Sequence, residues 1–198
     1  MIDEPFRAAF ALRLAPAARA LARRGLSPNA ITVGAFVLAL AAALLVALGW
    51  GWTGLAIWLA SRVLDGFDGL VARESGRSSP FGALLDVTLD MAAYSLMLVA
   101  FARVHPEERL LWELVLVGYV LASTSTLVLS SLLEARAQKT GNRSVQFTAG
   151  LAEAGETTIT YVLLTVLPAY AAAIGWGWCA LVWATVVQRV VLARRLLR

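Results

Sequence analysis

Four aspartates stand at regular spacing on two consecutive apolar stretches of the 198-residue chain, at Asp65, Asp68, Asp86 and Asp90. The members of each pair are three or four residues apart, so on a helix both carboxylates of a pair project from one face. Acidic groups inside apolar helices are energetically costly and need a compensating partner. If the two stretches pack as a helical hairpin, the four carboxylates converge and form a site for positively charged ligands.

Divalent metal ions suit this set of ligands. Oxygen donors without a neighbouring cysteine or histidine cluster favour Mg²⁺ or Mn²⁺ over zinc. Four carboxylates can hold two such ions about 3.5–4 Å apart, an arrangement that serves in-line displacement at phosphorus. Gly69 and Ala72 are small enough for a diphosphate to approach, and Arg73 is placed to neutralise phosphate oxygens. The residues therefore predict metal-assisted chemistry on a phosphate ester.

The same residues resemble the signature of the CDP-alcohol phosphotransferase (CDP-alcohol phosphatidyltransferase) family. That signature reads D-x-x-D-G-x-x-A-R, eight residues, then G-x-x-x-D-x-x-x-D. The chain carries every fixed residue of it, at Asp65, Asp68, Gly69, Ala72, Arg73, Gly82, Asp86 and Asp90. Pro28-Asn29 followed by Thr32 is similar to the P-N-x-x-T element of the family. The resemblance is specific over about residues 27–90.

The resemblance implies a role for each of these residues. Asp65, Asp68 and Asp86 would be metal ligands, while Asp90 would share the second metal and act as general base. The cytidine diphosphate portion of a CDP-linked lipid donor would be held by Asn29, Thr32, Asp65, Asp68, Gly69, Ala72, Arg73 and Gly82. The acceptor hydroxyl would attack the lipid-side phosphorus and CMP would leave. The resemblance also implies two divalent cations, Mg²⁺ or Mn²⁺, and a homodimer.

The acceptor is a small alcohol whose identity the sequence leaves open. Glu153 and Glu156 stand three apart at the start of an apolar segment, where they serve either as helix-capping acids or as part of an acceptor pocket. Arg136 and Arg143 are candidate ligands for a phosphorylated acceptor, or else charges that set membrane orientation. Two glutamates favour an unphosphorylated alcohol. The alternative is an enzyme like phosphatidylglycerophosphate or phosphatidylinositol phosphate synthase, which uses a phosphorylated acceptor.

The composition indicates a protein dissolved mainly in lipid. Hydrophobic residues make up 60% of the chain, charged residues 15%, and the mean hydropathy is +0.74. Soluble domains carry about 45–50% apolar and about 25% charged residues. The net charge of +4 at pH 7 does not indicate nucleic-acid binding, because the charges stand at the ends of apolar runs. The chain is therefore expected to be an integral membrane protein that contacts membrane lipids.

We expect an all-α integral membrane fold of six transmembrane helices, preceded by an N-terminal amphipathic interfacial helix. The domain layout is a juxtamembrane segment at 1–26 and a six-helix membrane domain at 27–198. The expected spans are 30–49, 52–70, 82–104, 110–133, 151–167 and 169–192. Long Leu/Ala/Val runs without strict alternation favour helices over a barrel. Ser27 is the expected N-cap of the first span, and Pro28 its first helical residue.

Basic residues gather on one side of this topology. They precede the first span, lie in alternate loops and close the chain, at Arg7, Arg13, Arg19, Arg23, Arg24, Arg73, Arg77, Arg136, Lys139, Arg143, Arg189, Arg194, Arg195 and Arg198. The positive-inside rule then places both termini in the cytoplasm. The active site is expected to face the cytoplasm, in what is expected to be a bacterial cytoplasmic (inner) membrane.

Two other functions compete with this interpretation. An intramembrane prenyltransferase also uses aspartate-rich motifs and Mg²⁺, but it normally has two separated motifs and more spans. An ion transporter would spread its acidic residues along a pathway. Arg62, one turn before Asp65, has two possible roles as well: a structural ion pair with an aspartate, which its spacing favours, or a contact to phosphate.

Overall fold

The computed structural model describes residues 14–140 and 153–197, and within these ranges it is entirely helical. A short helix at 14–23 precedes six longer ones. They are α2 (Pro28–Ala47), α3 (Gly51–Glu74), α4 (Pro80–Val104), α5 (Arg109–Thr140), α6 (Ala154–Val166) and α7 (Ala171–Leu196), with 3₁₀ turns at Pro106–Glu108 and Pro168–Tyr170. Each expected span corresponds to one of these six helices, with ends that differ by a few residues.

Two helices that build the site begin with the same Ser-Pro sequence. Ser27 is the N-cap of α2 and Pro28 its first residue, as the sequence predicts, although the Ser27 side chain makes no capping hydrogen bond. Ser79 is the N-cap of α4, and its hydroxyl accepts a hydrogen bond of 3.0 Å from the amide of Gly82. Proline at the first position has no N–H to leave unsatisfied, which fixes where each helix starts.

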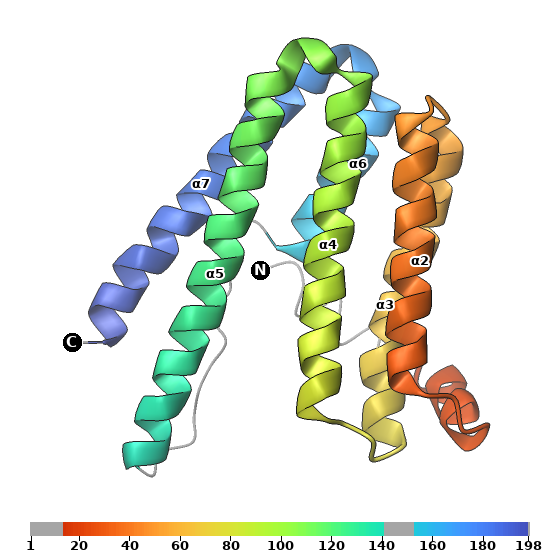
Figure 1. Ribbon diagram of the computed structural model, residues 1–198, viewed down its shortest axis with the longest axis vertical. Coiled ribbons are helices and arrows are strands. Elements are labelled where there is room, and N and C mark those ends of the chain that lie inside the picture. Colours follow the sequence, from red (N-terminus) through yellow and green to blue (C-terminus); the bar gives the residue numbers. More distant parts are fainter. Residues whose placement is uncertain (1–13, 141–152, 198) are drawn as a thin grey trace.

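The helices fall into two groups (Figure 1). Helices α2, α3 and α4 lie together, while α5 and α7 run side by side and α6 lies behind α4. Glycines permit the closest approaches between neighbours. A methyl group at Gly54 of α3 would lie 2.6 Å from a Val46 methyl of α2, and one at Gly118 of α5 would lie 2.6 Å from a Val182 methyl of α7.

Much of the apolar side-chain surface faces outward. Among the described residues, four segments are long and apolar enough to cross a membrane, namely Pro28–Ala47, Pro80–Val104, Pro106–Arg136 and Pro168–Leu196. Large apolar side chains on them are half exposed or more, such as Leu44 at 56% and Val187 at 60%. A lipid bilayer accounts for this exposure, since lipid-facing positions need no protein cover. The chain is an integral membrane protein.

An aromatic cluster joins α3, α4 and α6 beside the aspartates. The Trp58 ring lies 5.3 Å from the Tyr94 ring and 5.4 Å from the Tyr161 ring, both in edge-on geometry. The Tyr161 hydroxyl donates a 2.7 Å hydrogen bond to the Tyr94 carbonyl. Trp58 stands one turn before Arg62, and Tyr94 one turn after Asp90, so this packing fixes the register of the two helices that carry the carboxylates.

Candidate active site

Three of the four aspartates converge between α3 and α4. One carboxylate oxygen from each of Asp65, Asp68 and Asp86 lies within 4.8 Å of the others. Asp68 is buried, and Asp65 and Asp86 are half-buried. Three oxygen ligands at this spacing fit a hard divalent cation such as Mg²⁺ or Mn²⁺. The predicted convergence of these three carboxylates is observed, but α3 and α4 do not pack closely as a hairpin: both pack mainly on α2, and their acidic side chains meet beside it.

Asp90 lies beside this cluster and has a different partner. It stands one helical turn after Asp86 on α4, and its Oδ1 forms an ion pair with Nη1 of Arg62 on α3. The same Arg62 nitrogen lies 3.6 Å from Oδ2 of Asp65. The structural ion pair that the spacing of Arg62 favoured is therefore present. Arg62 links Asp90 to the three-carboxylate cluster.

The start of α2 reaches the aspartates. The hydroxyl of Thr32 donates a hydrogen bond of 2.5 Å to Oδ2 of Asp68, and the Gly69 amide donates to Oδ1 of the same carboxylate. A methyl group at Gly82 would lie 3.1 Å from Oδ1 of Asn29, so the first turns of α2 and α4 face each other. The two sequence elements that resemble the family, 28–32 and 65–90, thus come together in space.

Gly69 and Arg73 lie on the same side of α3 as the aspartates. Among the described residues, a methyl group at Gly69 would meet only Nη1 of Arg73, at 3.4 Å. The Arg73 charge acts on the Asp68 carboxylate. Ala72, which precedes Arg73, is half-buried. An absent side chain next to a guanidinium is the arrangement expected for the close approach of a phosphate group.

The start of α6, with the acceptor candidates Glu153 and Glu156, meets α4 at Tyr94, one turn beyond Asp90. The Tyr94 hydroxyl donates to the Ala154 carbonyl at 3.4 Å, which brings the start of α6 to α4. Glu153 is the N-cap residue of α6 but makes no side-chain capping bond, and Glu156 lies in the first turn. Oε2 of Glu156 is buried and has no hydrogen-bond partner among the described residues. A buried carboxylate oxygen without a partner is costly, and the acceptor role of Glu156 stays a prediction.

A buried arginine on α7 belongs to the same neighbourhood. Arg189 is 9% exposed, and its Nη1 donates to the Ala122 carbonyl of α5 at 2.8 Å. Its Nε has no partner within the described ranges, and Glu153 acts on its charge. The sequence pattern groups Arg189 with the charges that close the chain, whereas the structure buries it against α5. The available signal was its position inside an apolar helix, five residues before Arg194 of the terminal arginine pair.

The two other acceptor candidates are Arg136 and Arg143. Arg136 is exposed, and its Nη1 donates to the Leu196 carbonyl near the end of α7 at 2.8 Å. A cation at a helix C-terminus stabilises the last carbonyls, which is a structural role. Arg143 lies outside the described residues. The acceptor role of Arg136 and Arg143 remains a prediction.

The family is settled by comparison of the whole chain with known proteins. A family model described as CDP-alcohol phosphatidyltransferase matches residues 26–191. The chain belongs to this family. The resemblance carried by the aspartate motif is thereby confirmed. The match begins just before α2 and ends within the last two turns of α7.

Individual members of the family are similar over most of the chain. The inner membrane protein YnjF of Escherichia coli (strain K12) is 31% identical over 176 residues, which are 87% of this chain and 85% of YnjF. The phosphatidylinositol phosphate synthase of Mycobacterium tuberculosis (strain H37Rv) is 33% identical over 141 residues, or 69% of this chain and 63% of that enzyme.

Solved structures of a phosphatidylinositol phosphate synthase share the fold. The Mycobacterium tuberculosis enzyme in complex with manganese and citrate superimposes with a TM-score of 0.67 at 25% identity, covering 90% of this chain and 87% of that one. The same enzyme with CDP-DAG bound gives a TM-score of 0.65 at 24% identity, covering 90% and 92%. The all-helical membrane fold is therefore that of the family.

Family membership and the site together identify the chemistry in outline. This CDP-alcohol phosphatidyltransferase is a membrane enzyme of phospholipid biosynthesis and a transferase of substituted phosphate groups. Its cluster of Asp65, Asp68 and Asp86 fits a divalent metal ion. The family match rules out the two competing interpretations, an intramembrane prenyltransferase and an ion transporter.

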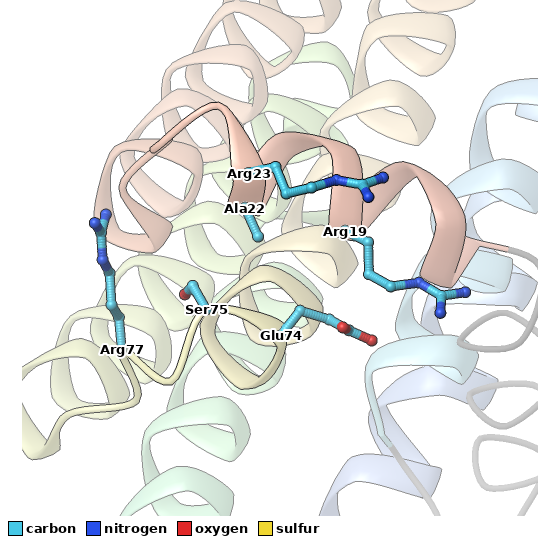
Figure 2. A pocket seen from close by; sticks show the side chains of 6 residues that line it. All are labelled: Arg19, Ala22, Arg23, Glu74, Ser75 and Arg77. Carbon is cyan, nitrogen blue, oxygen red and sulfur yellow. The ribbon is translucent and has the colours of Figure 1, made fainter.

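A separate cavity of about 320 Å³ lies on the outer side of α3, against the helix at 14–23 (Figure 2). Its lining residues are Arg19, Ala22, Arg23, Glu74, Ser75 and Arg77. The guanidinium groups of Arg19 and Arg77 lie on opposite sides of it, and Nη1 of Arg77 donates to the Gly25 carbonyl at 3.3 Å. The Gly25 carbonyl follows the end of the helix at 14–23, so Arg77 complements a helix C-terminus, whereas Arg19 donates to the Ala15 carbonyl of its own helix at 3.3 Å. None of the four aspartates lines this cavity.

Proposed function

We propose that this enzyme transfers a phosphatidyl group from a CDP-alcohol, such as CDP-diacylglycerol, to the hydroxyl of a small polar alcohol and releases CMP. The observation that carries the proposal is the convergence of Asp65, Asp68 and Asp86 beside Thr32. This arrangement combines a cation-binding cluster with the α2 residues that the family resemblance assigns to the nucleotide. The Mycobacterium tuberculosis relative solved with CDP-DAG bound supports the donor class.

In this proposal Asp65, Asp68 and Asp86 hold a divalent ion, and Asp90 joins them in holding a second. When bound, the ions neutralise the charge that develops on the leaving phosphate. Manganese in the relative's structure supports this cofactor class, with Mg²⁺ as the alternative ion. The three-carboxylate geometry is consistent with the first ion, and the position of Asp90 beside the cluster is where a second ion would be shared.

The chain's own residues perform the remaining steps. Asn29, Thr32, Gly69, Ala72, Arg73 and Gly82 bind and orient the cytidine diphosphate portion. Asp90 takes the proton from the acceptor hydroxyl, whose oxygen forms a bond to the lipid-side phosphorus. The bond between that phosphorus and the bridging oxygen breaks, and CMP leaves with this oxygen. Because the acceptor hydroxyl is held next to the half-buried Asp90, it gives its proton to this carboxylate at the membrane face rather than to bulk water.

We place the acceptor between Asp90, Tyr94 and the start of α6. Tyr94 contacts Ala154, and the buried Oε2 of Glu156 offers an acceptor of hydrogen bonds from a polyol or an amino alcohol. Glu153 and Glu156 are thus the acceptor residues of the unphosphorylated case. Arg136 and Arg143 are retained as acceptor residues of the phosphorylated case.

A phosphorylated acceptor is the second candidate, and one observation favours it. Arg189 is a buried cation with an Nε that lacks a partner among the described residues, close enough to Glu153 for their charges to interact. Such a group suits a phosphate oxygen. The relatives that are phosphatidylinositol phosphate synthases agree with this candidate.

The membrane arrangement completes the proposal. Six spans follow if α3 and α6 cross the bilayer with the four long apolar helices. The juxtamembrane part of the chain, of which the structure describes residues 14–26, then lies at the interface, and the domain at 27–198 spans the membrane. Basic residues place both termini and the active site on the cytoplasmic side of a bacterial inner membrane, consistent with the inner-membrane relative. The homodimer implied by the family resemblance is part of the proposal.

The test is CMP release by the purified protein in lipid. CDP-diacylglycerol and Mg²⁺ or Mn²⁺ are supplied with inositol, glycerol, serine, ethanolamine or choline, and in parallel with inositol phosphate or glycerol phosphate. Chelator is the control. Metal-dependent release with an unphosphorylated alcohol alone establishes the first candidate, and release with a phosphorylated alcohol alone establishes the second. No release from folded protein with any acceptor refutes the proposed donor.

A further inference from the structure

Arg62 lies beside the three-aspartate cluster, between Asp65 and Asp90. Its Nη1 pairs with Oδ1 of Asp90 and lies 3.6 Å from Oδ2 of Asp65, and its side chain is only 11% exposed. Arg62, a residue of α3, therefore contacts a carboxylate of its own helix and one of α4. An arginine buried in an apolar helix is costly unless its charge is used.

The guanidinium is held on a second side by aromatic rings. Its central carbon lies 4.6 Å from the Trp58 ring centre and 5.1 Å from the Tyr94 ring centre. Its Nε donates to Oγ of Ser61 at 3.3 Å, and that hydroxyl donates to the Trp58 carbonyl at 2.7 Å. Cation–π contacts and hydrogen bonds from one side, with carboxylates on the other, fix the guanidinium in one position.

This arrangement separates Asp90 from the other three carboxylates. Asp65, Asp68 and Asp86 share one cluster, whereas Asp90, one turn further along α4, is engaged by Arg62. Arg62 contacts Oδ1, which allows Oδ2 to serve the acceptor. A free carboxylate next to bound cations would instead be drawn toward them by Coulomb attraction.

We propose that Arg62 is a positioning residue, which holds Oδ1 of Asp90 so that this carboxylate does not collapse onto the three-aspartate cluster; Asp90 can then share the second ion and stay available to the acceptor hydroxyl. The proposal rests on the proposed function, in which Asp90 is the general base. Arg62 acts through Asp90 and contacts no substrate in this scheme. It also adds a positive charge next to the cluster, which weakens the attraction of the carboxylates for a cation.

When Arg62 loses its charge, the affinity for Mn²⁺ is expected to rise and kcat is expected to fall. In Arg62→Gln, Asp90 is released and the cluster gains net negative charge, so we expect Mn²⁺ to bind about threefold more tightly or better. Turnover is expected to fall about tenfold or more, because the base is no longer oriented. The donor KM is expected to stay within about twofold, since no donor contact is lost. A merely structural residue would not produce this combination.

The experiment measures Mn²⁺ binding by electron paramagnetic resonance without substrates, and kcat and donor KM by CMP release. Arg109→Gln is the matched control, because Arg109 also pairs with an acid, Glu113 at 2.7 Å, but at an exposed position where its side chain is 83% exposed. That control is expected to change neither quantity. Arg62→Lys keeps the charge, so its Mn²⁺ affinity is expected to match the wild type while kcat recovers only in part.

The double variant Arg62→Gln with Asp90→Asn decides whether Arg62 acts through Asp90. If it does, most of the gain in Mn²⁺ affinity disappears in the double variant. Unchanged or weaker Mn²⁺ binding in Arg62→Gln, or a rise in donor KM with kcat unchanged, overturns the proposal and makes Arg62 a structural or phosphate-contacting residue. Wild-type protein that binds Mn²⁺ but releases no CMP refutes the proposed function instead, while the Mn²⁺ comparison still reports whether Arg62 restrains Asp90.

If Arg62→Gln does not fold, Arg62→Lys and Trp58→Phe carry the test. Phe keeps a ring under the guanidinium but a smaller one, so the arginine is held less firmly. Both variants are expected to lower kcat with Mn²⁺ affinity and donor KM near wild type. Wild-type kcat in both would overturn the proposal.

Discussion

The hydroxyl of Thr32 on α2 hydrogen-bonds Oδ2 of Asp68 on α3 at 2.5 Å, across 36 positions of sequence. The same hydroxyl lies 3.1 Å from the Pro28 carbonyl, so its rotamer is set by the first turn of α2. Both residues are buried. This bond joins the P-N-x-x-T element to the aspartate motif and orients one carboxylate of the metal cluster.

Thr32→Val keeps the branched shape but removes the hydrogen bond to Asp68. Hydrogen bonds to charged groups contribute about 1.5–3 kcal/mol, so we expect kcat/KM for the donor to fall about tenfold to a hundredfold. CMP release at several Mn²⁺ concentrations measures this. Thr32→Ser, which keeps the hydroxyl, is the control and should retain most activity; equal losses in both variants would show that the hydrogen bond is not responsible.

Asp90→Asn and Asp68→Asn should separate the base from the metal ligands. Without its general base the enzyme is expected to lose about 10²- to 10⁴-fold in kcat. Mn²⁺ binding should persist in Asp90→Asn, since Asp65, Asp68 and Asp86 remain, and should be strongly weakened in Asp68→Asn. Near-native turnover by folded Asp90→Asn would show that Asp90 is not the base.

Gly69→Ala tests the approach of the donor phosphates. The fold should tolerate the added methyl group, whose sole contact within 4 Å in the described part of the chain is Nη1 of Arg73 at 3.4 Å. We expect a higher donor KM together with a melting temperature close to that of the wild type. Gly177→Ala is the matched control, because a methyl group there meets none of the described residues within 4 Å. An unchanged donor KM would remove Gly69 from the donor site.

Gly54→Val should destabilise the protein without touching the site. A methyl group at Gly54 already lies 2.6 Å from a Val46 methyl and 2.8 Å from the Ala42 carbonyl, so α2 and α3 would have to separate. Overpacking of this kind costs about 1–3 kcal/mol. Thermal unfolding in detergent measures it. Gly51→Ala should be close to neutral, because its methyl group would lie 3.5 Å from Thr165, an ordinary contact distance.

The two acceptor candidates predict different effects at α6 and α7. With an unphosphorylated acceptor we expect Glu156→Gln to raise the acceptor KM and Arg189→Gln to leave it nearly unchanged. Loss of a charge-assisted bond corresponds to about a tenfold to hundredfold change. Steady-state kinetics with varied acceptor measure both. A large rise in acceptor KM only in Arg189→Gln would favour the phosphorylated candidate.

Sequence alone determined the helices and the chemistry of the aspartates. Fixed offsets on α3 and α4 place Asp65 with Asp68 and Asp86 with Asp90, and helix geometry makes those offsets decisive. The Ser-Pro starts of α2 and α4 follow from local chemistry as well, since proline fits only the first helical turn. Such features depend on neighbours within a few residues, which is why a sequence can reveal them.

Tertiary structure decided which partner each charged group meets. Only the packing of α2 on α3 brings Thr32 to Asp68. Only the position of α4 relative to α3 pairs Asp90 with Arg62 and leaves Asp86 in the cluster with Asp65 and Asp68. The burial of Arg189 against α5 likewise separates it from the terminal arginines. These outcomes depend on contacts between side chains tens of residues apart, where a shift of one helical turn exchanges the partners and periodicity along the sequence carries no information.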